Sequence, residues 1–221
     1  MSKPMTGEEI VALTKKHTLF EWSAQSKVDP IPVARADGIY FYTPEGKRFI
    51  DFNSQLMSVN AGHGERRIVD AIHRQLSTLD YANPFMATEP RARLGEKLAQ
   101  LCPGDLDVFF FTNGGAEANE NAIKLARQYT GRHKIMVRYR SYHGGTAGAI
   151  ALTGDPRRWF AEPSIPGVIR APDFHKYGRK VPEPLDVCIR EIEEIIRYEG
   201  GQNIAAFLME TVVGTNGILV P

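Results

Sequence analysis

Residues 109–129 read FFFTNGGAEANENAIKLARQY, and this stretch decides the fold. The apolar run 108–111 predicts a short strand that is buried on both faces. Two adjacent glycines, Gly114 and Gly115, then allow backbone angles that a Cβ would forbid. Apolar residues recur at helical spacing across 116–129 and predict an amphipathic helix. The N-terminus of that helix presents N–H groups without partners, which predicts a site for a phosphate.

The phosphate interpretation has alternatives. Glycine turns join many strands to helices with nothing bound. The turn has neither a GxxxxGK[ST] pattern nor a GxGxxG pattern, which excludes a P-loop and the usual dinucleotide fingerprint. Within the predicted helix, Glu120 and Lys124 stand four residues apart and predict a surface ion pair.

Two further predicted strands end in polar residues. Residues 134–139 are followed by Tyr142 and His143 in a glycine loop, and residues 203–209 are followed by Glu210. Ligands gather at the carboxyl ends of parallel strands in open α/β sheets. Taken alone, the Tyr142-His143 pair favours plain loop packing, and a carboxylate such as Glu210 is more often a cap or an ion-pair partner than a catalyst. The alternation of apolar strands with helices predicts an α/β fold whose mostly parallel sheet is covered on both faces.

Composition excludes several kinds of protein. The 221 residues are 43% hydrophobic, enough for a sizeable core, and 27 Lys plus Arg balance 26 Asp plus Glu at a net charge of +1. That balance argues against a nucleic-acid or membrane-surface role. The two cysteines and six histidines show no metal-ligand spacing, and no run is apolar enough for a signal peptide or a membrane span. We expect a cytoplasmic protein without a metal site.

The first part of the chain predicts a small N-terminal region. Thr6 and Glu9 have the spacing of a capping box, and three strand-like runs within 30–52 predict an antiparallel meander. We expect residues 1–52 to form this region and residues 53–221 to form a larger, incomplete domain. The other expected elements are helices over 6–20, 65–79 and 89–101 and a polar loop over 53–64.

Three short motifs of this sequence resemble motifs of the class III aminotransferases, which bind pyridoxal 5'-phosphate. They are TNGGAEAN at 112–119, Tyr142-His143-Gly144, and ETVVG at 210–214. The resemblance implies that the backbone N–H groups of Gly115 and Ala116 hold the cofactor phosphate. It also implies that Tyr142 lies against the pyridine ring, that His143 belongs to the same cofactor-binding word, and that Glu210 supports the site.

The resemblance covers residues 20–221 and implies a fold and an activity. The fold is the type I fold of pyridoxal-phosphate-dependent transferases, here truncated and preceded by the small antiparallel meander. The sequence is most similar in character to taurine–pyruvate and β-alanine–pyruvate aminotransferases. The implied activity is transamination between an amine or ω-amino acid donor and a keto acid, and the cofactor supplies the electron sink.

Four residues match family positions that face the substrate: Trp22, Leu56, Met57 and Phe85. Each also has a plain structural interpretation. Trp22 beside an aromatic neighbour is typical of packing, and Met57 can fill an irregular gap. Phe85 stands in the segment 83–86, which on composition alone is a turn. By resemblance that segment reaches into the active site of a partner subunit, so we expect a homodimer or a dimer with a complementary C-terminal chain.

The sequence lacks two family residues on which catalysis depends. The family has an Asp that pairs with the pyridine nitrogen and, further on, a lysine that forms the Schiff base, and both follow the position of Glu210. No lysine here stands in that context; the candidates are Lys97, Lys124, Lys134, Lys176 and Lys180. We therefore expect the 221 residues to be an inactive N-terminal part of an aminotransferase.

Two other functions fit the same residues. One is a different α/β enzyme with a phosphate-bearing ligand, such as a nucleotide sugar or a dinucleotide, bound at the same turn. The other is a non-catalytic binding or assembly subunit built on the same fold.

Overall fold

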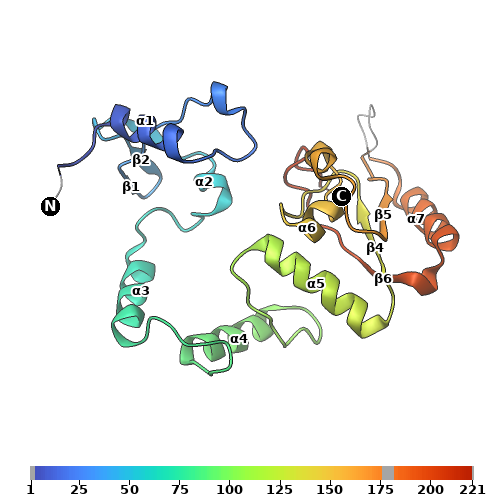
Figure 1. The fold of residues 1–221 in the computed structure, drawn as a ribbon. Coiled ribbons are helices and arrows are strands. Elements are labelled where there is room, and N and C mark those ends of the chain that lie inside the picture. The colour runs from blue at the N-terminus through green and yellow to red at the C-terminus, as the bar shows by residue number, and fades with distance from the viewer. Residues whose placement is uncertain (1–2, 176–181, 221) are drawn as a thin grey trace. The chain divides into compact units, whose positions relative to one another are not determined.

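The structure of the protein is a computed structural model that describes residues 3–175 and 182–220. The chain divides into two compact units, Met1–Glu96 and Lys97–Pro221, which we call the N-terminal unit and the C-terminal unit. Each unit is described by itself; Figure 1 labels their helices and strands. The predicted domain boundary after residue 52 stays a prediction.

A three-stranded antiparallel meander forms the sheet of the N-terminal unit. Strands β1 (Arg35–Asp37), β2 (Tyr40–Tyr42) and β3 (Arg48–Ile50) lie in the order β1-β2-β3, as the sequence predicts. Phe41 and Phe49 face each other across β2 and β3 with ring centroids 5.1 Å apart. Such aromatic cross-strand pairs stabilise one face of a small sheet.

Three helices predicted in the first part of the chain are confirmed, of which the last, α4, runs across the boundary between the two units. Helix α1 (Gly7–His17) starts at the predicted capping box, in which Glu9 N donates to Thr6 Oγ1 at 3.2 Å and Thr6 N donates to Glu9 Oε2 at 2.8 Å. Helices α3 (Arg66–Thr78) and α4 (Glu89–Leu101) follow the predicted ranges closely. A 3-10 helix, η1 (Gln25–Lys27), lies between α1 and the meander.

The predicted loop over 53–64 contains a left-handed turn. The segment α2 (Ser54–Met57) has φ values of 49° at Ser54, 49° at Gln55, 56° at Leu56 and 63° at Met57. Left-handed backbone costs roughly 1–2 kcal/mol for each residue with a Cβ, so neighbouring contacts must hold it. Asp51 supplies them, because its Oδ1 accepts from Gln55 N at 3.1 Å and its Oδ2 lies 2.6 Å from Nε2 of His63.

A parallel sheet organises the C-terminal unit. Strands β4 (Lys134–Arg138), β5 (Val168–Ala171) and β6 (Ile204–Phe207) lie in the order β5-β4-β6, so the first strand in the chain is the central one. Burial along β4 is nearly complete from Ile135 to Arg138. A strand flanked on both edges and covered on both faces requires such a run. The predicted α/β class with a parallel sheet is confirmed.

Helices cover both faces of this sheet. Helices α5 (Gly115–Thr130) and α6 (Ala147–Leu152) pack on one face, where Ile123 and Leu152 contact Ile135 and Val137 of β4. Helix α7 (Leu185–Glu199) packs on the other face against Met136. The alternation along β4 sends odd and even residues to opposite cores. The connections include 3-10 helices η2 (Pro156–Ala161) and η3 (Gly201–Asn203).

The prediction of a buried strand over 108–111 is wrong. Within the described residues the run belongs to no helix or strand, and no strand pairs with it. Val108 is 91% exposed and Phe110 is 66% exposed. An apolar run becomes a buried strand only when neighbours bond its N–H and C=O groups and cover its faces, and this run has no such neighbours among them.

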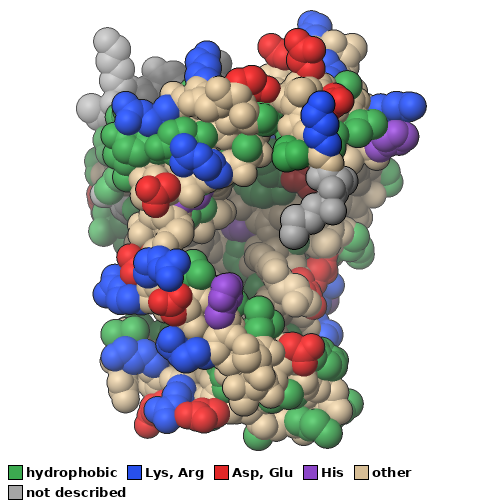
Figure 2. Space-filling model, turned by 90° about the vertical axis from the view of Figure 1, so that its left-hand side faces the viewer, with side chains coloured by type: hydrophobic (Ala, Val, Ile, Leu, Met, Phe, Trp, Pro, Cys, Tyr) green, Lys and Arg blue, Asp and Glu red, His purple; other side chains and the backbone are tan. Residues whose placement is uncertain are grey.

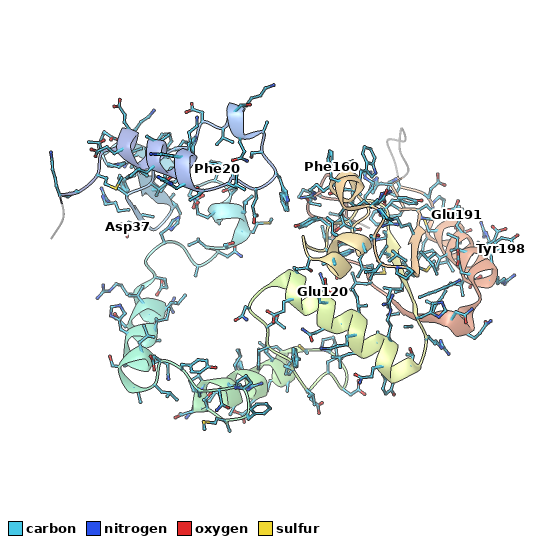
Figure 3. The ribbon with its side chains drawn as sticks, in the orientation of Figure 1. Phe20, Asp37, Glu120, Phe160, Glu191 and Tyr198 are labelled. Carbon is cyan, nitrogen blue, oxygen red and sulfur yellow. The ribbon has the colours of Figure 1, made fainter. Side chains whose placement is uncertain are left out.

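The predicted ion pair between Glu120 and Lys124 is also wrong. Among the described residues Glu120 pairs with no lysine; its Oε1 accepts from Gly148 N at 2.6 Å and from Ala149 N at 3.2 Å, so it caps the start of α6 (Figure 3). Burial alone would raise the pKa of Glu120, but hydrogen bonds from Thr146, Gly148 and Ala149 outweigh it and lower the pKa.

Surface features agree with the balanced composition. On the face that Figure 2 shows, Lys and Arg side chains are interspersed with Asp and Glu. None of the helices in the ranges 3–175 and 182–220 is long and apolar enough to cross a membrane.

Candidate cofactor site

The N-terminus of α5 has the open donors that an anion needs. Gly114 precedes the helix in extended backbone, with φ −166° and ψ 165°, and accepts the first helical bond from Ala118 N at 3.0 Å. The N–H groups of Gly115, Ala116 and Glu117 therefore have no acceptor among the described residues. A Cβ built at Gly114 or Gly115 would have no heavy atom within 4 Å. The turn thus combines open donors, the positive end of a helix dipole and open space.

Side chains of the same word fix the shape of this turn. Asn113 donates its backbone N–H to Glu117 Oε2 at 2.9 Å and its side-chain amide to the same oxygen at 3.3 Å. The hydroxyl of Thr112 donates to the carbonyl of Gly114 at 3.1 Å. The donors of the first turn of α5 are therefore held ready before any ligand arrives, which lowers the ordering cost of binding.

The loop after β4 is held by buried polar contacts. Ser141 Oγ donates to the carbonyl of Arg138 at 2.7 Å, and Gly154 N donates to Ser141 O at 3.0 Å. His143 N donates to Thr153 Oγ1 at 3.0 Å. These bonds fix the backbone on both sides of Tyr142, so the direction of its ring is set by the fold.

The two predicted cofactor-binding segments, 112–119 and 142–144, are in contact. Asn119 Nδ2 of the helix word donates to the carbonyl of His143 at 2.7 Å. Gly144 has φ +135°, and a Cβ there would lie 2.6 Å from the Cβ of Ala116. Only glycine permits this approach. The fold therefore places the open N-terminus of α5 directly beside the loop that carries Tyr142 and His143.

His143 is buried next to a carboxylate. Its Nδ1 lies 3.9 Å from Oε1 of Glu210, and within the described ranges its Nε2 has no hydrogen-bond partner. Burial lowers the pKa of His143 more than Glu210 raises it, and the nearby Arg138 lowers it further. The imidazole is therefore neutral near pH 7, with one ring nitrogen left to bind another group.

Glu210 is held by an arginine that the sequence reasoning did not identify. Arg138 ends β4, its side chain is 5% exposed, and its Nη2 donates to the carbonyl of Glu210 at 2.7 Å and to Oε2 of Glu210 at 3.3 Å. The only sequence signal is the charge that closes an apolar strand. A buried guanidinium must find carboxylates or carbonyls, but the sequence does not say which.

Tyr142 carries a second arginine that sequence reasoning missed. The guanidinium carbon of Arg157 lies 3.9 Å from the centroid of the Tyr142 ring, a cation–π contact. Asp155 binds the same guanidinium, with Nε of Arg157 2.9 Å from its Oδ2, and Thr215 Oγ1 accepts from it at 2.9 Å. Burial would raise the pKa of Asp155, but its hydrogen bonds and charge contacts, mainly with Arg157, lower it.

The predicted substrate residues all belong to the N-terminal unit. Leu56 and Met57 are neighbours on the left-handed turn, and both are exposed. Trp22 is 63% exposed with φ 52°, and Phe85 is 99% exposed in the turn after α3, where Asn83 Oδ1 accepts from Phe85 N at 3.0 Å. The roles of these four residues toward a substrate stay a prediction.

Comparison with known proteins agrees with this geometry. A parallel sheet, a helix N-terminus with open donors and a Tyr-His loop beside it are features typical of α/β proteins that bind a phosphate-bearing ligand. Residues 22–221 match the family model "Aminotransferase class-III". The chain belongs to the class III aminotransferases, a family that uses pyridoxal phosphate.

Individual relatives extend this result. The chain is 32% identical to the hypotaurine/taurine–pyruvate aminotransferase of Paracoccus denitrificans, over 93% of this chain and 47% of that protein. A solved structure of taurine:2-oxoglutarate aminotransferase from Bifidobacterium kashiwanohense, in complex with PLP and glutamate, is 39% identical with a TM-score of 0.90. An (S)-enantioselective omega-transaminase from Thermomicrobium roseum is 35% identical with a TM-score of 0.92.

The matches cover nearly all of this chain but only about half of each relative. The two solved structures are matched over 100% and 99% of this chain, but over only 51% and 52% of their own chains. The chain spans about half the length of the curated relatives it matches.

Proposed function

We propose that this chain supplies the phosphate-binding and ring-holding half of a pyridoxal phosphate site. The reaction is transamination between an amine or ω-amino acid donor and a keto acid. The bond from Asn119 Nδ2 to the carbonyl of His143, 2.7 Å long, carries the proposal. It joins the open helix N-terminus to the Tyr-His loop, so one ligand with a phosphate and an aromatic ring fits both.

Each residue has a separate task toward that ligand. The N–H groups of Gly115 and Ala116 bind the phosphate, because the helix N-terminus favours a dianion. Tyr142 lies against the pyridine ring, and Arg157 and the buried backbone bonds of its loop hold it there. Neutral His143 and the carboxyl group of Glu210 complete the wall at the carboxyl end of the sheet. Pyridoxal phosphate, when bound, supplies the electron sink.

We propose separate contacts for the amine donor, on residues that lie in the N-terminal unit. Trp22, Leu56, Met57 and Phe85 are the proposed contacts of the amine donor. The names of the relatives, which include taurine aminotransferases and an omega-transaminase, favour a donor whose amine is distant from its acidic group, either a carboxylate or, as in taurine, a sulfonate in its place. Strain at Leu56 and Met57 fits a pocket wall that is fixed before the substrate arrives.

A pair of glycine variants tests the phosphate cradle. Gly115 is the first helical residue, where proline is well tolerated, and Gly114 before it is already extended, as the residue before a proline prefers. Gly115→Pro removes one donor and should weaken pyridoxal phosphate binding about tenfold, the loss of one charge-assisted hydrogen bond. Gly114→Ala keeps every donor and serves as the matched control. Equilibrium dialysis with equal binding by wild type and Gly115→Pro would rule out the cradle.

Spectra of the purified protein test the two competing functions. A pyridoxal spectrum after purification supports the proposal, whereas nucleotide absorbance at the same turn would favour an enzyme with a nucleotide-type ligand. A chain that binds no phosphate compound in dialysis would favour an assembly subunit.

We further propose that the 221 residues are inactive alone, because none of their lysines stands in the family's Schiff-base context. Lys134 bonds Glu199 Oε2 at 2.7 Å, and Lys176 and Lys180 lie outside the described residues. Borohydride treatment with pyridoxal phosphate, followed by peptide mapping, should label no single lysine stoichiometrically. One fully labelled lysine together with transaminase turnover would overturn this proposal.

The proposed assembly is a homodimer or a dimer with a complementary C-terminal chain. Half-exposed apolar side chains along α3, at Ile68, Ile72 and Leu76, favour an interface of the obligate kind. Sedimentation at micromolar concentration should give more than one chain per particle. A compact, well-folded monomer would contradict the proposal.

A further inference from the structure

A buried charge cluster joins the carboxyl ends of the three parallel strands. Arg138 is the last residue of β4, Asp173 follows β5 by two residues, and Glu210 follows β6 by three. Arg138 and Asp173 are 4% and 6% exposed, and Glu210 is half-buried. Charges are rarely buried unless they are paired, so the cluster needs an explanation.

The guanidinium of Arg138 is shared between two carboxylates. Its Nη2 donates to Glu210 twice, at the backbone carbonyl and at Oε2, and its Nε lies 3.7 Å from Oδ1 of Asp173. The ring of Phe174 lies 5.7 Å from the guanidinium carbon. Arg140 holds Asp173 from its other side, where Arg140 N donates to Oδ2 at 2.8 Å.

Arg138 is only partly paired with Asp173, which indicates that the charge cluster does more than stabilise the fold. The distance of 3.7 Å is too long for a hydrogen bond, and among the described residues Nε of Arg138 and Oδ1 of Asp173 have no hydrogen-bond partner. Burial raises the pKa of Asp173 despite the two nearby arginines. The short bonds of Arg138 all go to Glu210, so the geometry of the cluster favours Glu210 over the ion pair with Asp173.

Glu210 in turn faces His143, whose Nδ1 lies 3.9 Å from Oε1 of Glu210. Without Arg138, Glu210 and Asp173 would be two neighbouring carboxylates with no positive charge between them. Repulsion and solvation would then turn the Glu210 side chain outward, away from His143. The orientation of Glu210 therefore depends on one guanidinium.

We infer that Arg138 is a positioning residue that fixes the Glu210 carboxylate beside His143 in the cofactor site, with Asp173 holding Arg138 in place. The inference rests on the proposed function, because it assigns a purpose to the position of Glu210. Arg138 touches no reacting atom and acts through Glu210 alone.

A double-mutant cycle separates this role from simple stabilisation. Arg138→Gln, Glu210→Gln and the double variant are compared with wild type for pyridoxal phosphate binding by equilibrium dialysis. We expect about tenfold weaker binding for each single variant, the loss of one charge-assisted hydrogen bond. The double variant should bind no more weakly than Glu210→Gln, because both bonds of Arg138 to Glu210, at the carbonyl and at Oε2, act on the cofactor site only by orienting the carboxylate that Glu210→Gln already removes. Losses that multiply would overturn the inference, as would unchanged binding by Arg138→Gln.

Lys134 provides a matched control. It is a half-buried cation at the first position of the same strand β4, and its Nζ donates to the backbone carbonyl of Glu199 at 2.8 Å and to Oε2 of Glu199 at 2.7 Å. It therefore makes the same two kinds of bond as Arg138 at the opposite end of the strand, and makes no contact with Glu210 among the described residues. Lys134→Gln should reduce stability yet bind pyridoxal phosphate within about twofold of wild type, since its site is separate. An equal loss of binding in Lys134→Gln would mean that any cation paired at an end of β4 produces the effect.

Two further outcomes are informative. If Arg138→Gln does not fold, Asp173→Asn tests the same chain of contacts, and its loss of binding should vanish in the Glu210→Gln background. A loss that persists there overturns the inference. If wild type itself binds no pyridoxal phosphate, the proposed function fails, and the inference fails with it; binding by wild type with a failed cycle leaves the proposed function intact.

Discussion

Two runs in the C-terminal unit are both rich in apolar residues, but one is buried in the sheet and the other is largely exposed. Residues 134–138, KIMVR, form β4, pair with β5 and β6, and bury Met136 and Val137 completely. Residues 108–111, VFFF, belong to no strand and are unpaired within the described ranges, with Val108 almost fully exposed.

The contrast shows where burial originates. Both runs have residues that fit a pleated surface, β-branched Ile and Val in 134–138 and one Val with three Phe in 108–111, so intrinsic preference does not separate them. The difference lies in what each run meets: β4 has a strand on either edge and helices on either face. Whether a strand is buried therefore depends on the elements that surround it. We expect four measurable consequences of this contrast, given from the largest to the smallest.

Hydrogen exchange should give the largest difference between the two runs. Amides of β4 exchange only when the sheet opens, which costs about 5 kcal/mol or more, whereas those of 108–111 lack ladder bonds and open at nearly no cost. Exchange followed by mass spectrometry on the full chain measures both runs together. Equal protection of the two would show that 108–111 is paired in solution.

Truncation of one side chain in each run should separate them next. Met136→Ala removes a fully buried side chain and should lower the free energy of unfolding by about 2–5 kcal/mol. Val108→Ala removes an exposed one and should change it by less than about 0.5 kcal/mol. Urea unfolding followed by circular dichroism measures both changes. A large loss in Val108→Ala would mean that a second copy or another chain covers the run.

The glycine turns after the two runs sharpen the comparison. Gly144→Ala places a methyl group at φ +135° against Ala116, and should cost roughly 1–3 kcal/mol of stability. Gly114→Ala places one in extended backbone with open space, and should change stability by less than about 0.5 kcal/mol. Thermal unfolding of the two variants tests this; similar losses would contradict the contact between the two cofactor words.

The pH dependence of stability gives the smallest effect. The pKa of His143 lies below its ordinary value of 6.5 in the folded chain, mainly through burial, with Arg138 and Glu210 as the facing charges. The unfolded chain then binds the extra proton first as the pH falls. The contribution of His143 is thus complete above 6.5 and is lost as the pH falls through the lowered pKa, with a slope of at most about 1.4 kcal/mol per pH unit.

His143→Gln should flatten that slope, because glutamine does not titrate. Unfolding in urea at a series of pH values on either side of 6.5 measures it, with His175→Gln as the matched histidine control. An unchanged slope in His143→Gln would place the titration elsewhere.

Local patterns predicted much of the fold. The capping box at Thr6 and Glu9, the apolar letters of β4 and the glycine turn before α5 each act over a few residues, and the structure confirms all three elements. Six-residue α6 was missed because AGAIAL lacks polar periodicity and stands among glycines.

The polar contacts of the site could not be predicted in the same way. Arg138 meets Glu210 across 72 residues of sequence, and Arg157 meets Thr215 across 58. Helical spacing predicts that Glu120 pairs with Lys124, yet two backbone N–H groups 28 and 29 residues away are its partners. Helical spacing fixes which side chains are close on one helix, whereas tertiary contacts decide where a carboxylate finds its strongest donors.

The capping of α6 by Glu120 also sets an order of events in folding. Isolated helices shorter than about 12 residues are marginal in water, because the first turn costs more than it returns. Helix α6 is shorter than that, and the acceptor for its first N–H groups belongs to another helix. It therefore cannot be a folding nucleus. Helix α5 and its carboxylate must be in place first, and α6 then condenses onto the sheet as a late step.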